Sequence, residues 1–166
     1  SLLKINKNEK YSFLLESVEG GSKKGRFSIL GCDPDLIWTV SNGKASIKYL
    51  KHNYKYEINN NPIKGLRELI ELSKFHTSEA VPYPTLIGYL GYPMIQFMEK
   101  IKLQNNDNIK IPDATLIRPK IVAVFDNIKD TISIMTVCYP SKKLKPELAF
   151  KNSKFFLKKT IKKLER

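Results

Sequence analysis

Short runs of apolar and polar residues alternate along the first third of the chain, a pattern typical of β-strands. Turn-forming residues separate the runs, and Asn42-Gly43 is a strong signal for a two-residue hairpin. Because strands joined by short turns pair antiparallel, we expect a β-meander. The expected strands are Leu2 to Asn6, Tyr11 to Val18, Arg26 to Cys32, Leu36 to Ser41, Lys44 to Lys51 and Tyr54 to Ile58.

Helical periodicity begins after Pro62, and two further helices are predicted from Met94 to Ile101 and from Pro146 onward. The apolar stripe expected on the last helix is Phe150, Phe156 (or Phe155), Leu157, Ile161 and Leu164. The remaining expected strands are Leu86 to Tyr92, Leu116 to Ile117, Ile121 to Ile128 and Thr131 to Val137. This order predicts an α+β fold, with mostly antiparallel β-sheet in hairpins packed with a few helices.

The length of 166 residues predicts a single domain, residues 1–166, that can bury a core without disulfide bonds or structural metals. No apolar run reaches the roughly 18–20 residues that span a membrane, and no signal peptide opens the chain. Cys32 and Cys138 lie far apart and without metal-ligand spacing. Reduced thiols and a cytoplasmic location, with no membrane partner, are therefore the simpler expectation.

The formal net charge of +13 raises the question of a nucleic-acid partner. Nearly all of this charge comes from scattered lysines, and only four residues are arginine, the side chain best suited to phosphate and base contacts. We therefore expect no nucleic acid, and a basic nucleic-acid-binding module is the weaker alternative. The lysines of the last helix, Lys158, Lys159, Lys162 and Lys163, are expected to form a solvated face.

Motifs for catalysis or metal binding are missing from the sequence. It has no phosphate-binding glycine loop, no nucleophile elbow and no cluster of His, Cys, Asp and Glu with metal spacing. His52 is expected in a tight turn and His76 at the end of a helix. A clear fold pattern with little candidate chemistry indicates a binding or regulatory unit.

The first predicted hairpin is the most specific segment. If its loop centres on Ser22-Lys23, Ser17 lies opposite Ser28 and Leu15 opposite Leu30. Two hydroxyls at the end of an apolar face would suit a small amphipathic ligand. The residues of that shared face would be Phe13, Leu15, Ser17, Ser28 and Leu30.

Glu16 points to the opposite face of a regular strand. Its carboxylate could pair with a ligand ammonium or with Arg26. From the residues alone, the alternative is that Ser17 and Ser28 simply pair at the sheet surface while Glu16 is solvated.

Leu14-Leu15-Glu16-Ser17, followed after ten residues by Ser28, resembles the tryptophan-binding motif of anthranilate synthase component I. The flanking residues resemble the signature hairpin of that family, from Tyr11 to Ser17 and from Gly25 to Gly31. This match is the most specific one, because it fixes both residue types and spacing.

Later segments extend the resemblance over nearly the whole chain. Ile87-Gly88-Tyr89-Leu90-Gly91-Tyr92 resembles the Gly-Tyr-x-Gly-Tyr segment of the family, although Pro93 replaces the acidic residue usual after it. Ile111-Pro112-Asp113 and Val124-Phe125-Asp126 resemble its strand pair before the domain linker. The resemblance therefore implies the N-terminal part of component I.

In that family the enzyme is a lyase that converts chorismate to anthranilate in tryptophan biosynthesis, with ammonia that a glutamine amidotransferase subunit releases from glutamine. The resemblance implies that Mg²⁺ and chorismate bind in a C-terminal region outside this chain, so no catalytic or metal residue is expected here. It also implies feedback inhibition by L-tryptophan. Component I of aminodeoxychorismate synthase, from the folate pathway, is the alternative with the same fold.

The resemblance implies a tryptophan site formed by Leu15, Glu16, Ser17, Phe27 and Ser28. Ser17 would offer a hydroxyl, Glu16 would balance the ligand ammonium, and Leu15 would supply apolar and backbone contacts. In the family, a second segment outside this chain completes the pocket. The chain alone could therefore bind tryptophan, or bind nothing because half of the pocket is missing.

Overall fold

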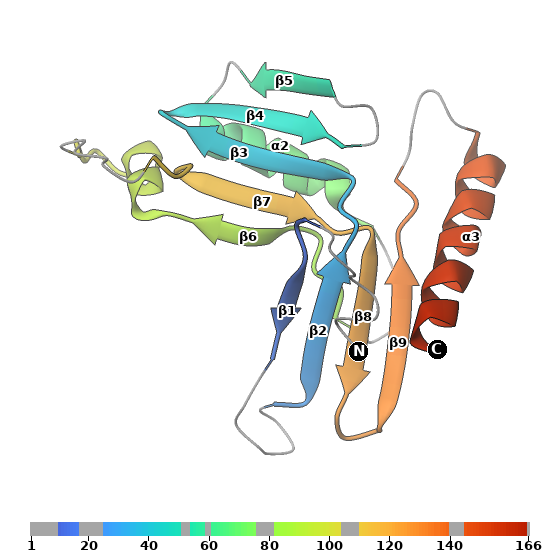
Figure 1. Cartoon of the computed structure of the whole chain (residues 1–166). Coiled ribbons are helices and arrows are strands. Elements are labelled where there is room, and N and C mark those ends of the chain that lie inside the picture. Colours follow the sequence, from blue (N-terminus) through green and yellow to red (C-terminus); the bar gives the residue numbers. More distant parts are fainter. Residues whose placement is uncertain are drawn as a thin grey trace. The chain divides into compact units, whose positions relative to one another are not determined.

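A computed structural model describes seven stretches of the chain, residues 10–16, 25–50, 54–58, 61–75, 82–103, 110–139 and 145–165. The chain divides into two compact units, and each unit holds one sheet (Figure 1). Unit 1 comprises residues 1–34, 77–84 and 119–166, and unit 2 comprises residues 35–76 and 85–118. All strand pairs described are antiparallel, so the predicted α+β fold with few helices is confirmed. The single domain stays a prediction.

Unit 1 is a four-stranded sheet, in the order β1-β2-β8-β9, with helix α3 (Figure 1). Its elements are β1 (Phe13–Leu15), β2 (Phe27–Cys32), β8 (Ile121–Asp126), β9 (Thr131–Thr136) and α3 (Pro146–Leu164). Phe156 and Leu164 of α3 pack against an apolar cluster on the sheet, which consists of Leu30, Cys32, Ile121 and Ala123. The predicted stripe is therefore right at these two positions and wrong at Phe150, which is 65% exposed.

Unit 2 is a five-stranded sheet in the order β5-β4-β3-β7-β6, with α2 on one face (Figure 1). Its elements are β3 (Leu36–Ser41), β4 (Lys44–Tyr49), β5 (Tyr54–Ile58), α2 (Pro62–Ser73), β6 (Ile87–Leu90), the 3-10 helix η1 (Tyr92–Phe97) and β7 (Ala114–Arg118). Asn61 caps α2, because its side-chain oxygen accepts a hydrogen bond of 2.9 Å from Ile63 N.

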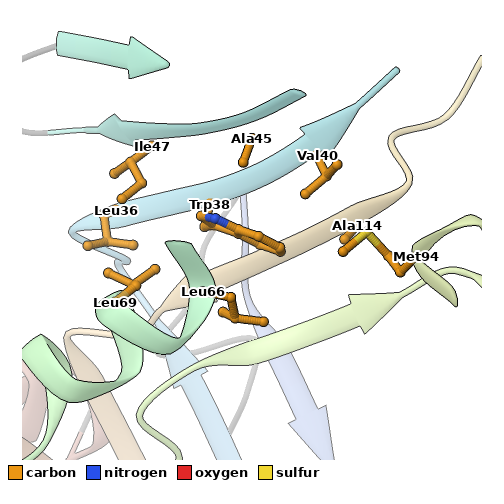
Figure 2. Packing of buried hydrophobic residues seen from close by; sticks show 9 residues of the cluster. All are labelled: Leu36, Trp38, Val40, Ala45, Ile47, Leu66, Leu69, Met94 and Ala114. Carbon is orange, nitrogen blue, oxygen red and sulfur yellow. The ribbon is translucent and has the colours of Figure 1, made fainter. Parts of the chain in front are cut away.

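Trp38 lies in the middle of the unit 2 core and is fully buried (Figure 2). Alternate residues of a strand point to one face, so Leu36, Trp38 and Val40 of β3 face the helix together. The rest of the core is Ala45, Ile47, Leu66, Leu69, Met94 and Ala114. The predicted helix after Pro62 is confirmed, since Leu66 and Leu69 provide its buried stripe.

The predicted β-meander is confirmed for β3, β4 and β5, which pair in sequence order, and is wrong between β2 and β3, which lie in different sheets. Strand β2 pairs with β8, whereas β3 pairs with β4 and β7. Pro34 separates β2 from β3, and Pro119 separates β7 from β8. Because proline has no N–H to donate to a ladder, it interrupts a strand, and two of the four crossings between the units occur at these residues.

The second predicted helix, Met94 to Ile101, is a 3-10 helix that begins at Tyr92. Pro93 occupies its first turn, where the fixed φ of proline favours a helix start. The predicted strand from Leu2 to Asn6 and both histidines lie outside the described residues. Within the part that is described, no helix is long and apolar enough to cross a membrane.

Candidate functional site

The hairpin predicted to carry the site is present, since β1 and β2 pair antiparallel. Its register places Leu15 opposite Ile29 and Leu14 opposite Leu30. The predicted register, with Leu15 opposite Leu30, is wrong by one residue. Because side chains alternate along a strand, such a shift moves one strand's side chains to the other face. Residues 17–24 lie outside the described residues.

The corrected register divides the candidate residues between two faces. Leu15 shares a face with Ile29 and Phe27, whereas Ser28 shares the opposite face with Leu30. Leu30 belongs to the cluster that α3 covers, so Leu15 and Phe27 lie on the side of the sheet away from α3. The single face predicted for Leu15 and Ser28 therefore does not form.

The candidate residues at the end of β1 are open to solvent. Leu14 and Leu15 are 41% and 45% exposed, and Glu16 is exposed as well. Phe27 and Ser28 are half-buried, and Ser17 lies outside the described residues. Because β1 is the edge strand of the described sheet, its apolar side chains present a surface on which a flat apolar ligand group can pack.

A ring-over-glycine contact in this hairpin was missed by the sequence reasoning. Phe13 lies opposite Gly31, and a Cβ added at Gly31 would overlap the Phe13 ring. An aromatic side chain packed over a cross-strand glycine fixes the register of the pair. This pairing of an aromatic residue with a glycine is the sequence signal that could have identified the correct register.

An ion pair holds the start of β2 against the end of β8. Arg26 Nε donates to both carboxylate oxygens of Asp126 at 3.1 Å, and Arg26 Nη2 donates to Oδ2 at 2.7 Å. The guanidinium also lies 4.7 Å from the ring centroid of Phe27. Arg26 was one of the two partners suggested for Glu16. It is instead paired with the carboxylate of Asp126, 100 residues away in sequence. Local patterns cannot find a pair of this separation.

Asp126 also organises the turn that follows β8. Its Oδ1 accepts hydrogen bonds from Ile128 N at 3.1 Å and Lys129 N at 3.2 Å. The hydrogen bonds from Arg26 lower the pKa of Asp126 to about 2; the two backbone donors act in the same direction, and partial burial opposes them. The start of β2, which carries Phe27 and Ser28, is thus held by a charged contact next to the loop of the hairpin.

This contact predicts a specific acid sensitivity. The pKa of Asp126 in the folded state lies below the unfolded value of about 3.9. The ionised carboxylate therefore stabilises the fold above about pH 4, and this contribution is lost as the pH falls toward 2. We expect Asp126→Asn to lower the urea midpoint at pH 6, with a difference from the parent that shrinks between pH 4 and pH 2. Far-UV circular dichroism gives the urea midpoint of both proteins at each pH.

The matched control is Asp130→Asn, which removes the same charge from the same turn, outside the Arg26 pair. Its urea midpoint should follow that of the parent at every pH. If the urea midpoint of Asp126→Asn equalled that of the parent at every pH, the stabilising role of the Arg26–Asp126 pair would be contradicted.

Among the residues that the structure describes, no group of three or more His, Cys, Asp and Glu could hold a metal ion. The resemblance places the Mg²⁺ of the family outside this chain. What the hairpin does offer is recognition: exposed leucines, a carboxylate and a neighbouring aromatic ring.

Comparisons with known proteins show what the chain resembles. No protein-family model matches it. It is 33% identical over 155 residues to "Anthranilate synthase component 1" of Cereibacter sphaeroides, a match that covers 90% of this chain and 31% of that protein. For the protein of the same name from Acetivibrio thermocellus the identity is 30% over 139 residues, covering 81% of this chain and 28% of the relative.

A solved structure shares the fold. The crystal structure of anthranilate synthase component I from Streptococcus pneumoniae TIGR4 matches with a TM-score of 0.60 at 26% sequence identity. The match covers 89% of this chain and 31% of that one. The chain thus spans about a third of the length of the relatives it matches. By sequence and by fold, the chain belongs to the family of anthranilate synthase component I.

Proposed function

We propose that this chain is the N-terminal regulatory part of an anthranilate synthase component I and that its β1–β2 hairpin binds L-tryptophan for feedback inhibition. The whole protein would be a cytoplasmic lyase that makes anthranilate from chorismate, with ammonia from a glutamine amidotransferase subunit. Chorismate and Mg²⁺ would bind outside this chain. One observation carries the proposal: the family's motif lies on an edge hairpin with exposed apolar residues.

Each proposed contact has a chemical reason. An indole ring requires an apolar surface, and Leu15 with Phe27 supplies one on the face of the sheet away from α3. Glu16, exposed at the end of β1, would balance the ligand ammonium. Ser17 would add a hydroxyl group. Ser28, on the other face, would act by supporting the hairpin, since Asn127 Nδ2 lies 3.5 Å from its Oγ.

Inhibition by this route is allosteric, since the proposed site and the reacting chorismate lie in different parts of the protein. Tryptophan can shift the enzyme toward an inactive state only if it binds that state more tightly than the active one. A coupling free energy of about 1–3 kcal/mol, or roughly 5–150-fold in affinity, is typical. The proposed contacts therefore need to be stronger in the inhibited conformation.

The test is the inhibition of the complete enzyme by L-tryptophan, with anthranilate formation followed by fluorescence. Removing a charge-assisted hydrogen bond typically costs about 1.5–3 kcal/mol. We therefore expect Glu16→Ala to raise the half-inhibiting tryptophan concentration about tenfold or more, and Ser17→Ala to raise it by a smaller factor. Uninhibited turnover should stay near that of the parent in both variants.

Glu57→Ala and Ser133→Ala are the matched controls, on β5 of unit 2 and on β9 of unit 1. Both should show inhibition like that of the parent. Unchanged inhibition in Glu16→Ala and Ser17→Ala would reject the site, and failure to form anthranilate from chorismate and glutamine would reject the function of the whole protein.

A further inference from the structure

A cation covers the aromatic ring of the proposed tryptophan site. Arg26 Cζ lies over the ring of Phe27, 4.7 Å from its centroid, which is within the distance of about 6 Å for a cation–π contact. Arginine suits such a contact better than lysine, because its planar guanidinium can stack on an aromatic face. One face of the Phe27 ring is therefore occupied by the residue that precedes it in the chain.

The guanidinium is itself fixed in place. It donates three hydrogen bonds to the Asp126 carboxylate, from Nε to both oxygens and from Nη2 to Oδ2. A fork of this kind sets the plane of the guanidinium as well as its position. The Asp126 side chain is only 11% exposed, whereas that of Arg26 is 36% exposed. A nearly buried carboxylate thus orients a cation that is still partly open to solvent.

The backbone on both sides of Phe27 is held by the same turn. Asn127 N donates to Arg26 O at 2.8 Å, and Asn127 Nδ2 donates to Gly25 O at 3.1 Å. Phe27 itself lies opposite Asp126 in the β2–β8 register. Because both its backbone and the cation over its ring are fixed, the Phe27 side chain has little freedom to reorient on the face of the sheet away from α3.

We propose that Arg26 is a positioning residue of the tryptophan site, which covers one face of the Phe27 ring and so holds the ring for contact with an aromatic amino acid. This inference rests on the proposed function and names a residue that acts on the site without touching the ligand. A ring that is already fixed loses little freedom when an indole packs against it, so less of the binding free energy is spent on ordering the site. Asp126 acts one step further away, by fixing the guanidinium.

A purely structural role for Arg26 has a different signature. The ion pair with Asp126 stabilises unit 1 whether or not a ligand binds, so a variant that keeps this pair would then bind tryptophan like the parent. Arg26→Lys separates the two roles. Its ammonium can still pair with Asp126, but it is a point charge without a plane that stacks on Phe27.

Unit 1 contains a second group of a cation, a ring and a carboxylate, which provides the matched control. Lys120 Nζ lies 3.6 Å from the ring centroid of Phe156 and 3.5 Å from Asp33 Oδ2. This group lies at the other end of β2, and Phe156 packs on the face of the sheet that α3 covers. Lys120→Met therefore removes a cation from an aromatic ring of the same unit, away from the proposed site.

The experiment is calorimetric titration of L-tryptophan into the complete protein that contains this chain, with circular dichroism to verify the fold of each variant. We expect Phe27→Leu to bind tryptophan about fivefold more weakly, as loss of an aromatic pair implies. Arg26→Lys should weaken binding about threefold, as loss of a partly exposed cation–π contact implies, and Lys120→Met should bind like the parent. In the Phe27→Leu background, Arg26→Lys should cause no further loss, because it acts only through the ring.

Three results would contradict the inference. Parent-like affinity of Arg26→Lys, in a protein whose binding still depends on Glu16, would overturn the positioning role and leave the proposed function intact. Equal weakening by Arg26→Lys and Lys120→Met would assign both residues a structural role and would also overturn it. No binding of tryptophan to the parent protein would overturn the inference together with the proposed function. Arg26→Lys keeps the ion pair and should fold, so it decides the question even without Phe27→Leu.

Discussion

Replacing Gly88 by alanine is expected to destabilise unit 2 by about 2–6 kcal/mol, the sum of an overpacking and a backbone-strain contribution. A Cβ at Gly88 would lie 2.0 Å from the backbone oxygen of Thr115 on the neighbouring strand β7. Because that atom belongs to the backbone, it cannot move aside cheaply. The φ of Gly88 is +154°, a backbone conformation that residues other than glycine rarely adopt.

The same argument explains the Gly-Tyr-x-Gly-Tyr segment in physical terms. At its second glycine, Gly91, an added Cβ would lie 2.8 Å from the backbone oxygen of Asp113, which also accepts a hydrogen bond from Gly91 N at 2.8 Å. The glycines thus occur where β6 and the residue after it approach the backbone of a neighbouring segment. This close packing explains why the segment requires glycine at both positions.

Urea unfolding followed by the fluorescence of Trp38 measures the effect, since Trp38 is the one tryptophan in the sequence and lies in the unit 2 core. Gly43→Ala is the control: its φ is +74°, but the nearest atom to an added Cβ is 3.5 Å away. It should cost about 1 kcal/mol, from strain alone. An equal loss of stability in both variants would contradict the role of the close approach.

Asp35→Ala is expected to cost about 3 kcal/mol, because it removes the Asp35 carboxylate from the buried Arg118 guanidinium. Arg118 Nε donates to Asp35 Oδ1 at 2.8 Å, and Nη2 donates to Oδ2 of the same carboxylate. Arg118 Nη1 also donates to Ser73 Oγ at 3.0 Å. The Arg118 side chain is only 8% exposed. The network joins the end of α2 to β3 and β7, so we expect its loss to destabilise the whole of unit 2.

The control is an ion pair at the same helix end that lies in solvent. Glu71 and Lys74 are in contact at 2.7 Å, with side chains 66% and 61% exposed. Glu71→Ala should therefore cost less than about 0.5 kcal/mol. Both variants are compared with the parent by Trp38 fluorescence in urea. A loss of stability for Asp35→Ala as small as that for Glu71→Ala would show that the burial of Arg118 does not strengthen its ion pair.

The sequence pattern was sufficient for most individual elements. The bounds of β3 and β5 agree with prediction, and α2 begins where Pro62 and the cap at Asn61 indicate. Turn residues and periodicity are local signals, and these elements depend on local signals. The division of the strands between two sheets was not predictable in this way, because the β2–β8 pair joins residues about 90–100 positions apart.

For the candidate site, the sequence predicted the hairpin but not its register. The motif placed Leu15 and Phe27 on a hairpin, and the hairpin exists. The assumed loop centre put Ser28 on the same face as Leu15, which the register contradicts. Two contacts hold the strands of this hairpin: Phe13 packs over Gly31, and Arg26 pairs with Asp126. Rules for turn residues predict neither contact.

The central claim is that the β1–β2 hairpin contributes a receptor for tryptophan, and calorimetric titration of L-tryptophan into the complete protein tests it most directly. We predict one site per chain, at least tenfold weaker binding in Glu16→Ala, and binding equal to that of the parent in Glu57→Ala. Parent-like affinity in both variants, or no heat of binding in the complete protein, would contradict the claim.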